Sequence, residues 1–145
     1  MKIEKFLDSN PFAIMAIVTQ EIDRSIRADL MDEGLTFMQA LALVSIFFED
    51  GKAAHPKDMA ETFGMTKSNL SHLLNKLQEM KLVTRKVHAE DFRRQQVSLT
   101  VLGEKTCQRL IRYFNRMQDR LEESFGDAES LKRFNKKIRA LSEMN

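Results

Sequence analysis

The sequence predicts a mainly α-helical protein with a small β-hairpin, arranged as a winged helix-turn-helix, and three observations support this fold class. Apolar residues recur at three- and four-residue spacing through most of the chain, which is the signature of amphipathic helices. Two short helical segments, separated by Gly64, precede two stretches of strand-like composition at residues 82–87 and 95–99. No internal repeat or linker divides the chain, so we expect a single domain over residues 1–145.

The first expected helix runs from Pro11 to Asp32. Asn10 suits the N-cap, and proline suits the first turn because the amide hydrogen that it lacks has no partner there. Gly34 is placed to end the segment. The apolar positions of this helix form one stripe, which consists of Met15, Val18, Ile22, Ile26 and Leu30.

A buried helix is expected next, from Phe37 to Phe48. Thr36 and Gln39 match a capping box, in which each side chain accepts a hydrogen bond from the backbone of the other residue. The residues that follow are apolar on nearly every face of a helix, so this helix is predicted to lie at the centre of the core. The polar tripeptide Glu49-Asp50-Gly51 closes it.

The helix-turn-helix and its wing are predicted between residues 55 and 100. Pro56 starts a short helix that extends to about Phe63, and a glycine breaks it. Thr66 can cap the second helix, which continues to about Met80. The inner stripe of this second helix consists of Leu70, Leu73, Leu74 and Leu77.

Two more helices are expected after Thr100, which can cap the first of them. Apolar residues follow one face from Cys107 to Phe125, and a last amphipathic helix carries Phe134 on its stripe. Such stripes need a surface to pack on. We therefore expect a homodimer formed through residues 1–33 and 101–145.

The distribution of charge favours a polyanionic partner. Residues 1–54 carry five Lys and Arg against nine Asp and Glu, a balance of −4, whereas residues 55–100 carry eight against five, a balance of +3. No apolar run approaches the roughly 18 residues of a membrane span, and no signal-peptide layout opens the chain. We expect a cytoplasmic protein with no membrane partner.

No pattern in the sequence indicates an enzyme, a cofactor or a metal site. Gly-rich phosphate loops, nucleophile elbows and paired carboxylates in a cleft-forming context are missing from the sequence. The three histidines, His55, His72 and His88, share no metal-ligand spacing. Cys107 is the only cysteine, so it cannot form an intramolecular disulfide.

The outward face of the second helix is the predicted DNA-binding surface, because its residues are short, polar or basic. Thr66, Ser68 and Asn69, with the first amides of the helix, can donate hydrogen bonds to phosphates. Base edges in a major groove are within reach of Lys67, Asn69 and His72. The complete predicted set on this helix is Thr66, Lys67, Ser68, Asn69, Ser71, His72 and Lys76. In the wing, Arg93 and Arg94 can enter a minor groove.

These features resemble the MarR family of multiple-antibiotic-resistance regulators. The resemblance is carried by Asp91-Phe92-Arg93-Arg94 and by Leu99-Thr100-Val101-Leu102-Gly103, which match the family pattern of Asp-x-Arg followed by Leu-Thr-x-x-Gly. The order and length of the helices extend it from about residue 10 to 143. The family more often has a polar or acidic residue where Arg94 stands, so the sequence leaves open which arginine inserts.

The resemblance implies a sequence-specific transcription regulator that binds double-stranded DNA as a homodimer. It implies a palindromic operator, insertion of Arg93 into the minor groove, and an ion pair through which Asp91 steadies the wing. It also implies repression that a small aromatic or anionic effector relieves. The residues that bind such an effector are not identified by the sequence.

Two alternatives stay open at the level of sequence. One is a winged-helix protein-interaction module without DNA specificity, although the basic residues Lys67, Lys76, Arg93 and Arg94 are unusual for such a module. The other is a redox-responsive regulator that uses Cys107. This cysteine lies in the apolar stripe of its helix, where a buried structural thiol is the default.

Overall fold

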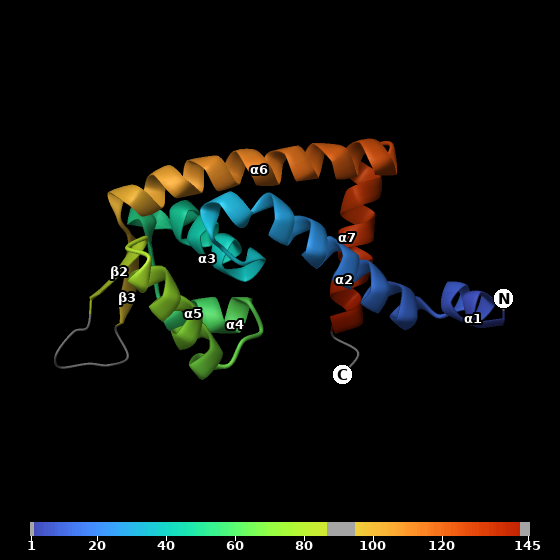
Figure 1. The fold of residues 1–145 in the computed structure, drawn as a ribbon, viewed down its shortest axis with the longest axis horizontal. Helices are drawn as coiled ribbons and strands as arrows, with labels where there is room; N and C mark the ends of the chain where they lie inside the picture. Colours follow the sequence, from blue (N-terminus) through green and yellow to red (C-terminus); the bar gives the residue numbers. More distant parts are fainter. Residues whose placement is uncertain (1, 87–94, 143–145) are drawn as a thin grey trace. The chain divides into compact units, whose positions relative to one another are not determined.

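A computed structural model describes residues 2–86 and 95–142 of the chain (Figure 1). The chain forms two compact units, Met1–Thr106 and Cys107–Asn145, and the boundary falls inside the helix α6. The described part is mostly helical with one small antiparallel sheet, as the sequence predicts. In the described ranges, no helix combines the length and the apolar character that crossing a membrane requires.

The N-terminal region contains one more helix than the sequence predicted. Helix α1 (Lys2–Ser9) precedes α2 (Pro11–Asp29), and the Asn10 side chain accepts a hydrogen bond from the amide of Ala13 at 3.1 Å, as expected of an N-cap. The expected end at Asp32 was wrong, because the chain tightens into a 3₁₀ turn, η1 (Met31–Glu33). Gly34 ends this turn with a φ of 64°, a conformation that favours glycine.

Helix α3 (Phe37–Phe48) is the core of the first unit and has the predicted bounds. Both hydrogen bonds of the predicted capping box between Thr36 and Gln39 are present. The prediction of a buried helix is confirmed for its middle, where Ala40, Leu43 and Ile46 have no exposed surface. Its last residue differs, since Phe48 is 70% exposed.

Helices α4 (Pro56–Thr62) and α5 (Lys67–Glu79) form the predicted helix-turn-helix and pack against each other (Figure 1). Strands β2 (Val83–Lys86) and β3 (Gln96–Leu99) form the described part of the wing, with Val83 opposite Leu99. The sequence missed β1 (Ala53–Ala54), which adds to β3 and makes the strand order β1-β3-β2. A two-residue strand of alanines is too short to give a periodic signal.

The second unit consists of the later part of α6 (Val101–Phe125) and of α7 (Ala128–Ser142). Gly126, with a φ of 83°, lies in the turn between these helices. The rings of Phe125 and Phe134 lie 4.8 Å apart between centroids and join the middle of α7 to the end of α6. Both predicted helices are therefore present, with the predicted interruption.

Candidate nucleic-acid interface

The N-terminus of α5 is built to present free amides. Thr66 has extended backbone angles, and its hydroxyl accepts a hydrogen bond from the amide of Asn69 at 3.2 Å, which makes it the predicted N-cap. The first amides of a helix have no carbonyl partner within it, and the helix dipole places partial positive charge there. Thr66, Lys67, Ser68 and Asn69 are all exposed around this end.

Helix α5 has two faces of opposite character. Its four leucines, Leu70, Leu73, Leu74 and Leu77, are buried as predicted. The remaining predicted site residues of the helix, Ser71, His72 and Lys76, are exposed, so one polar surface faces solvent. Lys76 forms an ion pair with Glu79 at 2.8 Å, and this neighbour partly neutralises its charge.

Hydrogen bonds connect the C-terminal end of α5, the wing and the start of α6, a contact region that we call the joint. The amide of Leu82 donates to the carbonyl of Leu77, and the carbonyl of Leu82 accepts from the amide of Thr100, both at 3.0 Å. The Thr100 hydroxyl donates to the carbonyl of Lys81 at 2.7 Å and accepts from the amide of Gly103 at 2.9 Å. Thr100 therefore caps α6 as predicted and also fixes the end of α5.

Glycine is required at position 103 of this joint. A Cβ atom placed on Gly103 would lie 2.0 Å from the carbonyl oxygen of Leu82, far inside van der Waals contact. The first turn of α6 thus approaches the backbone at the base of β2 more closely than any side chain permits.

A second tie joins the wing to the middle of α5. Arg85, on β2, donates from Nη2 to the carbonyl oxygen of Ser71 at 3.0 Å. Burial lowers the pKa of the Arg85 guanidinium below its ordinary value. Sequence reasoning did not single out Arg85, because nothing in the strand pattern indicates a partner on a helix fourteen residues away.

An open groove lies between α4, α5 and β2. It has a volume of about 640 Å³ and an electropositive lining, since three of its residues are the cations Lys57, Lys67 and Arg85. The side chains of Lys57 and Lys67 are both exposed. The Lys57 ammonium lies 3.9 Å from the Glu61 carboxylate. The groove continues the basic and polar surface of α5 toward the wing.

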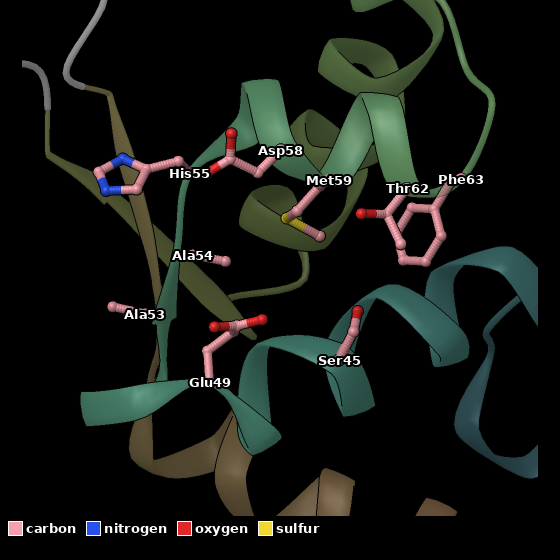
Figure 2. Close-up of a pocket in the computed structure, with 9 residues that line it drawn as sticks. All are labelled: Ser45, Glu49, Ala53, Ala54, His55, Asp58, Met59, Thr62 and Phe63. Carbon is pink, nitrogen blue, oxygen red and sulfur yellow. The ribbon is translucent and has the colours of Figure 1, made fainter.

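A separate cavity of about 120 Å³ lies between α3 and α4 at the base of the sheet (Figure 2). Ser45 and Glu49 line it from the side of α3, and Met59 and Thr62 face them from α4. None of the predicted DNA-binding residues lines it. His55 at its edge is hydrogen bonded through Nδ1 to the carbonyl of Gln95 at 3.2 Å, which joins α4 to β3.

The remaining sequence predictions concern the wing residues, Cys107 and metal binding. Asp91, Arg93 and Arg94, the predicted wing residues, lie outside the described residues. Cys107 is fully buried, which fits a structural thiol. Among residues 2–86 and 95–142, no group of three or more His, Cys, Asp or Glu side chains is placed to hold a metal ion.

A family model and solved structures match this chain. Residues 33–94 match the model of the MarR family. The solved structure of an S. aureus MepR-DNA complex matches with a TM-score of 0.81 at 21% identity, over 95% of this chain and 99% of that chain. AbsC from Streptomyces coelicolor, a MarR family transcriptional regulator, matches with a TM-score of 0.78 at 23% identity, over 91% and 89% of the two chains. A search of curated proteins found no match.

Proposed function

We propose that this chain, whose residues 33–94 match the model of the MarR family, is a transcription regulator that binds double-stranded DNA in a sequence-specific manner. The observation that carries this proposal is the two-faced helix α5, with four leucines buried and an uninterrupted polar face exposed. A recognition helix needs this division, because one side must pack on the domain while the other enters a major groove.

The contacts divide between phosphates and bases. The cap of α5, with Thr66, Ser68 and the free amides, suits phosphate oxygens, which position the helix without reading sequence. Asn69 and His72 carry donors and acceptors farther along the exposed face, where base edges lie. Ser71, Lys67 and Lys76 complete this surface. In the wing, Arg93 or Arg94 enters the adjacent minor groove, steadied by Asp91.

The regulator acts as a homodimer on a palindromic operator. Two recognition helices must lie roughly 34 Å apart to enter successive major grooves on one side of the duplex. Apolar side chains exposed on α1 and α2, and others exposed on α7, support a dimer built from the chain's ends. The S. aureus MepR structure, which matches over nearly its whole length, is a complex with DNA.

Repression and its relief follow as the regulatory part of the proposal. A small aromatic or anionic effector that binds only the conformation unable to bind DNA releases the operator by population shift. The cytoplasm is the compartment where such a protein meets its operator.

The direct test is selection of duplexes from a random pool, followed by a salt titration with the selected sequence. If the dimer makes six to ten phosphate contacts, its affinity falls by roughly 10³–10⁵ between 50 and 200 mM salt. A flat salt dependence, or no enrichment of any sequence, contradicts the proposal. Arg93→Ala should weaken binding at every salt concentration, with Lys137→Ala on the exposed face of α7 as the control.

The two alternatives fit the described residues less well. A protein-interaction module does not account for the exposed Lys67 beside the free amides of α5, nor for the exposed Lys76 on the same polar face. A redox response through Cys107 needs an accessible thiolate, whereas this thiol has no exposed surface. No described feature favours catalysis over binding.

A further inference from the structure

Arg85 contacts the backbone of the candidate recognition helix. It extends from β2, which lies beside α5 (Figure 1), and its Nη2 donates to the backbone carbonyl of Ser71 at 3.0 Å. Ser71 stands inside the helix, where a carbonyl already accepts the amide four residues later. The guanidinium therefore uses the second lone pair of that oxygen.

The contact between Arg85 and Ser71 carries costs in the free energy of folding. The Nε atom of Arg85 is buried and has no hydrogen-bond partner among the described residues. A buried donor without a partner costs free energy, and a half-buried cation adds a desolvation cost. An apolar side chain of similar length would fill the same space without these costs. The arginine at this position therefore calls for an explanation other than stability.

We propose that Arg85 is a positioning residue, which locks the rotation and the distance of α5 relative to the wing by holding the Ser71 carbonyl. The inference rests on the proposed function, since it names what orients the helix that reads DNA. We call the hydrogen bond from Arg85 to the Ser71 carbonyl the clamp. Ser71 and the next residue, His72, both belong to the exposed face of α5. Base edges tolerate little displacement of their partners, whereas phosphate contacts tolerate more.

The positioning role and direct phosphate binding by Arg85 predict different salt dependences. A cation that neutralises a phosphate contributes about one unit to the slope of log affinity against log salt. A residue that only orients α5 contributes nothing to that slope, but its loss lowers the preference for operator over random duplex.

The matched control is Lys86, the next residue of the same strand. Lys86 is exposed, carries the same charge and points to the opposite face of β2. Arg85→Gln and Lys86→Gln therefore each remove one positive charge, from adjacent positions on opposite faces of the strand. Affinities for the selected operator and for a random duplex are measured for both variants across a range of salt concentrations.

Arg85→Gln is expected to weaken operator binding by roughly tenfold or more, the size of losing one base contact. Its salt slope should equal that of wild type, and its affinity for random duplex should fall no further than that of Lys86→Gln. Equal losses on both duplexes, with a slope shallower by about one than that of wild type, overturn the proposal in favour of a phosphate contact. An unchanged operator affinity overturns it as well.

Two further measurements separate misfolding and failure of the proposed function from failure of the inference. Arg85→Met removes the buried unpaired donor, so it should unfold at the same temperature as wild type or higher, yet lose operator preference. If wild type prefers no duplex, the proposed function has failed. The clamp is then tested by itself, by measuring the carbonyl ¹³C chemical shift of Ser71. That shift should change in Arg85→Gln and not in Lys86→Gln; equal spectra overturn the clamp.

Discussion

Helices α5 and α2 are both amphipathic, but only α5 buries its whole apolar stripe within the described chain. All four stripe leucines of α5 are buried, down to 0% exposure at Leu77. In α2 and the residue after it, Ile26 and Leu30 are buried at 3% and 2%, whereas Val18 and Ile22 are 43% and 48% exposed. The stripe of α5 is thus buried within its own chain, whereas the stripe of α2 is buried only at its C-terminal end.

The proposed homodimer offers an explanation of this difference. A helix gains most of its stability from burying its apolar face, so an exposed stripe needs a surface from elsewhere. Helix α7 repeats the pattern, since Leu131 is buried while Phe134, Ile138 and Leu141 are exposed. In the proposed homodimer, a second copy of the chain would cover both stripes, which belong to the segments predicted to dimerise.

The largest expected effect comes from placing a charge on the open stripe of α2. Val18→Asp should dissociate the dimer, because a carboxylate in an apolar interface loses its hydration without gaining a partner. A monomer engages one half-site only, so operator affinity should fall by roughly 10²–10⁴. Light scattering after size exclusion measures the mass, and an operator titration measures the affinity.

Gln20→Asp is the matched control, because Gln20 is exposed and, at 100° per residue, lies away from the stripe on the same helix. It introduces the same charge two residues away and should remain dimeric. If Val18→Asp also remains dimeric at micromolar concentration, the exposed stripe is not the interface.

Truncation of the buried stripe should act on stability instead. Leu77→Ala removes a side chain with no exposed surface and should lower the free energy of unfolding by roughly 2–5 kcal/mol. Met15→Ala, on the open stripe, should cost much less in the monomer. Its effect should vary with protein concentration, since burial there requires association. Urea unfolding at two concentrations distinguishes the two variants, and a concentration-independent loss for Met15→Ala contradicts the comparison.

The same contrast explains how far the sequence predicted the structure. The period of the leucines in α5, the capping box at Thr36 and the cap at Thr100 are local signals, and each was confirmed. The clamp between Arg85 and Ser71 and the strand β1 depend on pairings between distant segments, which periodicity does not encode. Helix α1 was missed although Ile3, Phe6 and Leu7 have the spacing of an amphipathic helix, because eight residues are too few to establish a period.

Gly103→Ala tests the joint at the end of α5, with a smaller expected effect. In an ordinary helix interior, alanine is favoured over glycine by about 1 kcal/mol. Here the sign should reverse, because the new Cβ atom would lie 2.0 Å from the Leu82 oxygen and force α6 away. We expect a loss of roughly 1–3 kcal/mol in unfolding free energy. Gln108→Ala, at an exposed site of α6, is the control and should be nearly neutral. A stabilised Gly103→Ala variant contradicts the close approach.

The smallest expected effect concerns Asp127, which caps α7 in the second unit. Its carboxylate accepts from the backbone amide of Ser130 at 2.6 Å and from the Ser130 hydroxyl at 3.0 Å. The backbone hydrogen bond, followed by that of the hydroxyl, lowers the pKa of Asp127 below its ordinary value of 3.8. Because the pKa is lower in the folded than in the unfolded state, the cap stabilises fully above the ordinary value. This contribution is lost as the pH falls through the lowered folded value.

Two substitutions separate the cap from its charge. Asp127→Asn keeps a side-chain acceptor for the Ser130 amide, so it should retain most of the cap at neutral pH and lose the acid-side dependence. Asp127→Ala should lose both. Melting temperatures followed from neutral pH to about pH 3 measure the difference between each variant and wild type. That difference should shrink toward acid for Asp127→Ala, because protonation weakens the wild-type cap. A difference that grows toward acid would show that the ionised carboxylate does not stabilise α7.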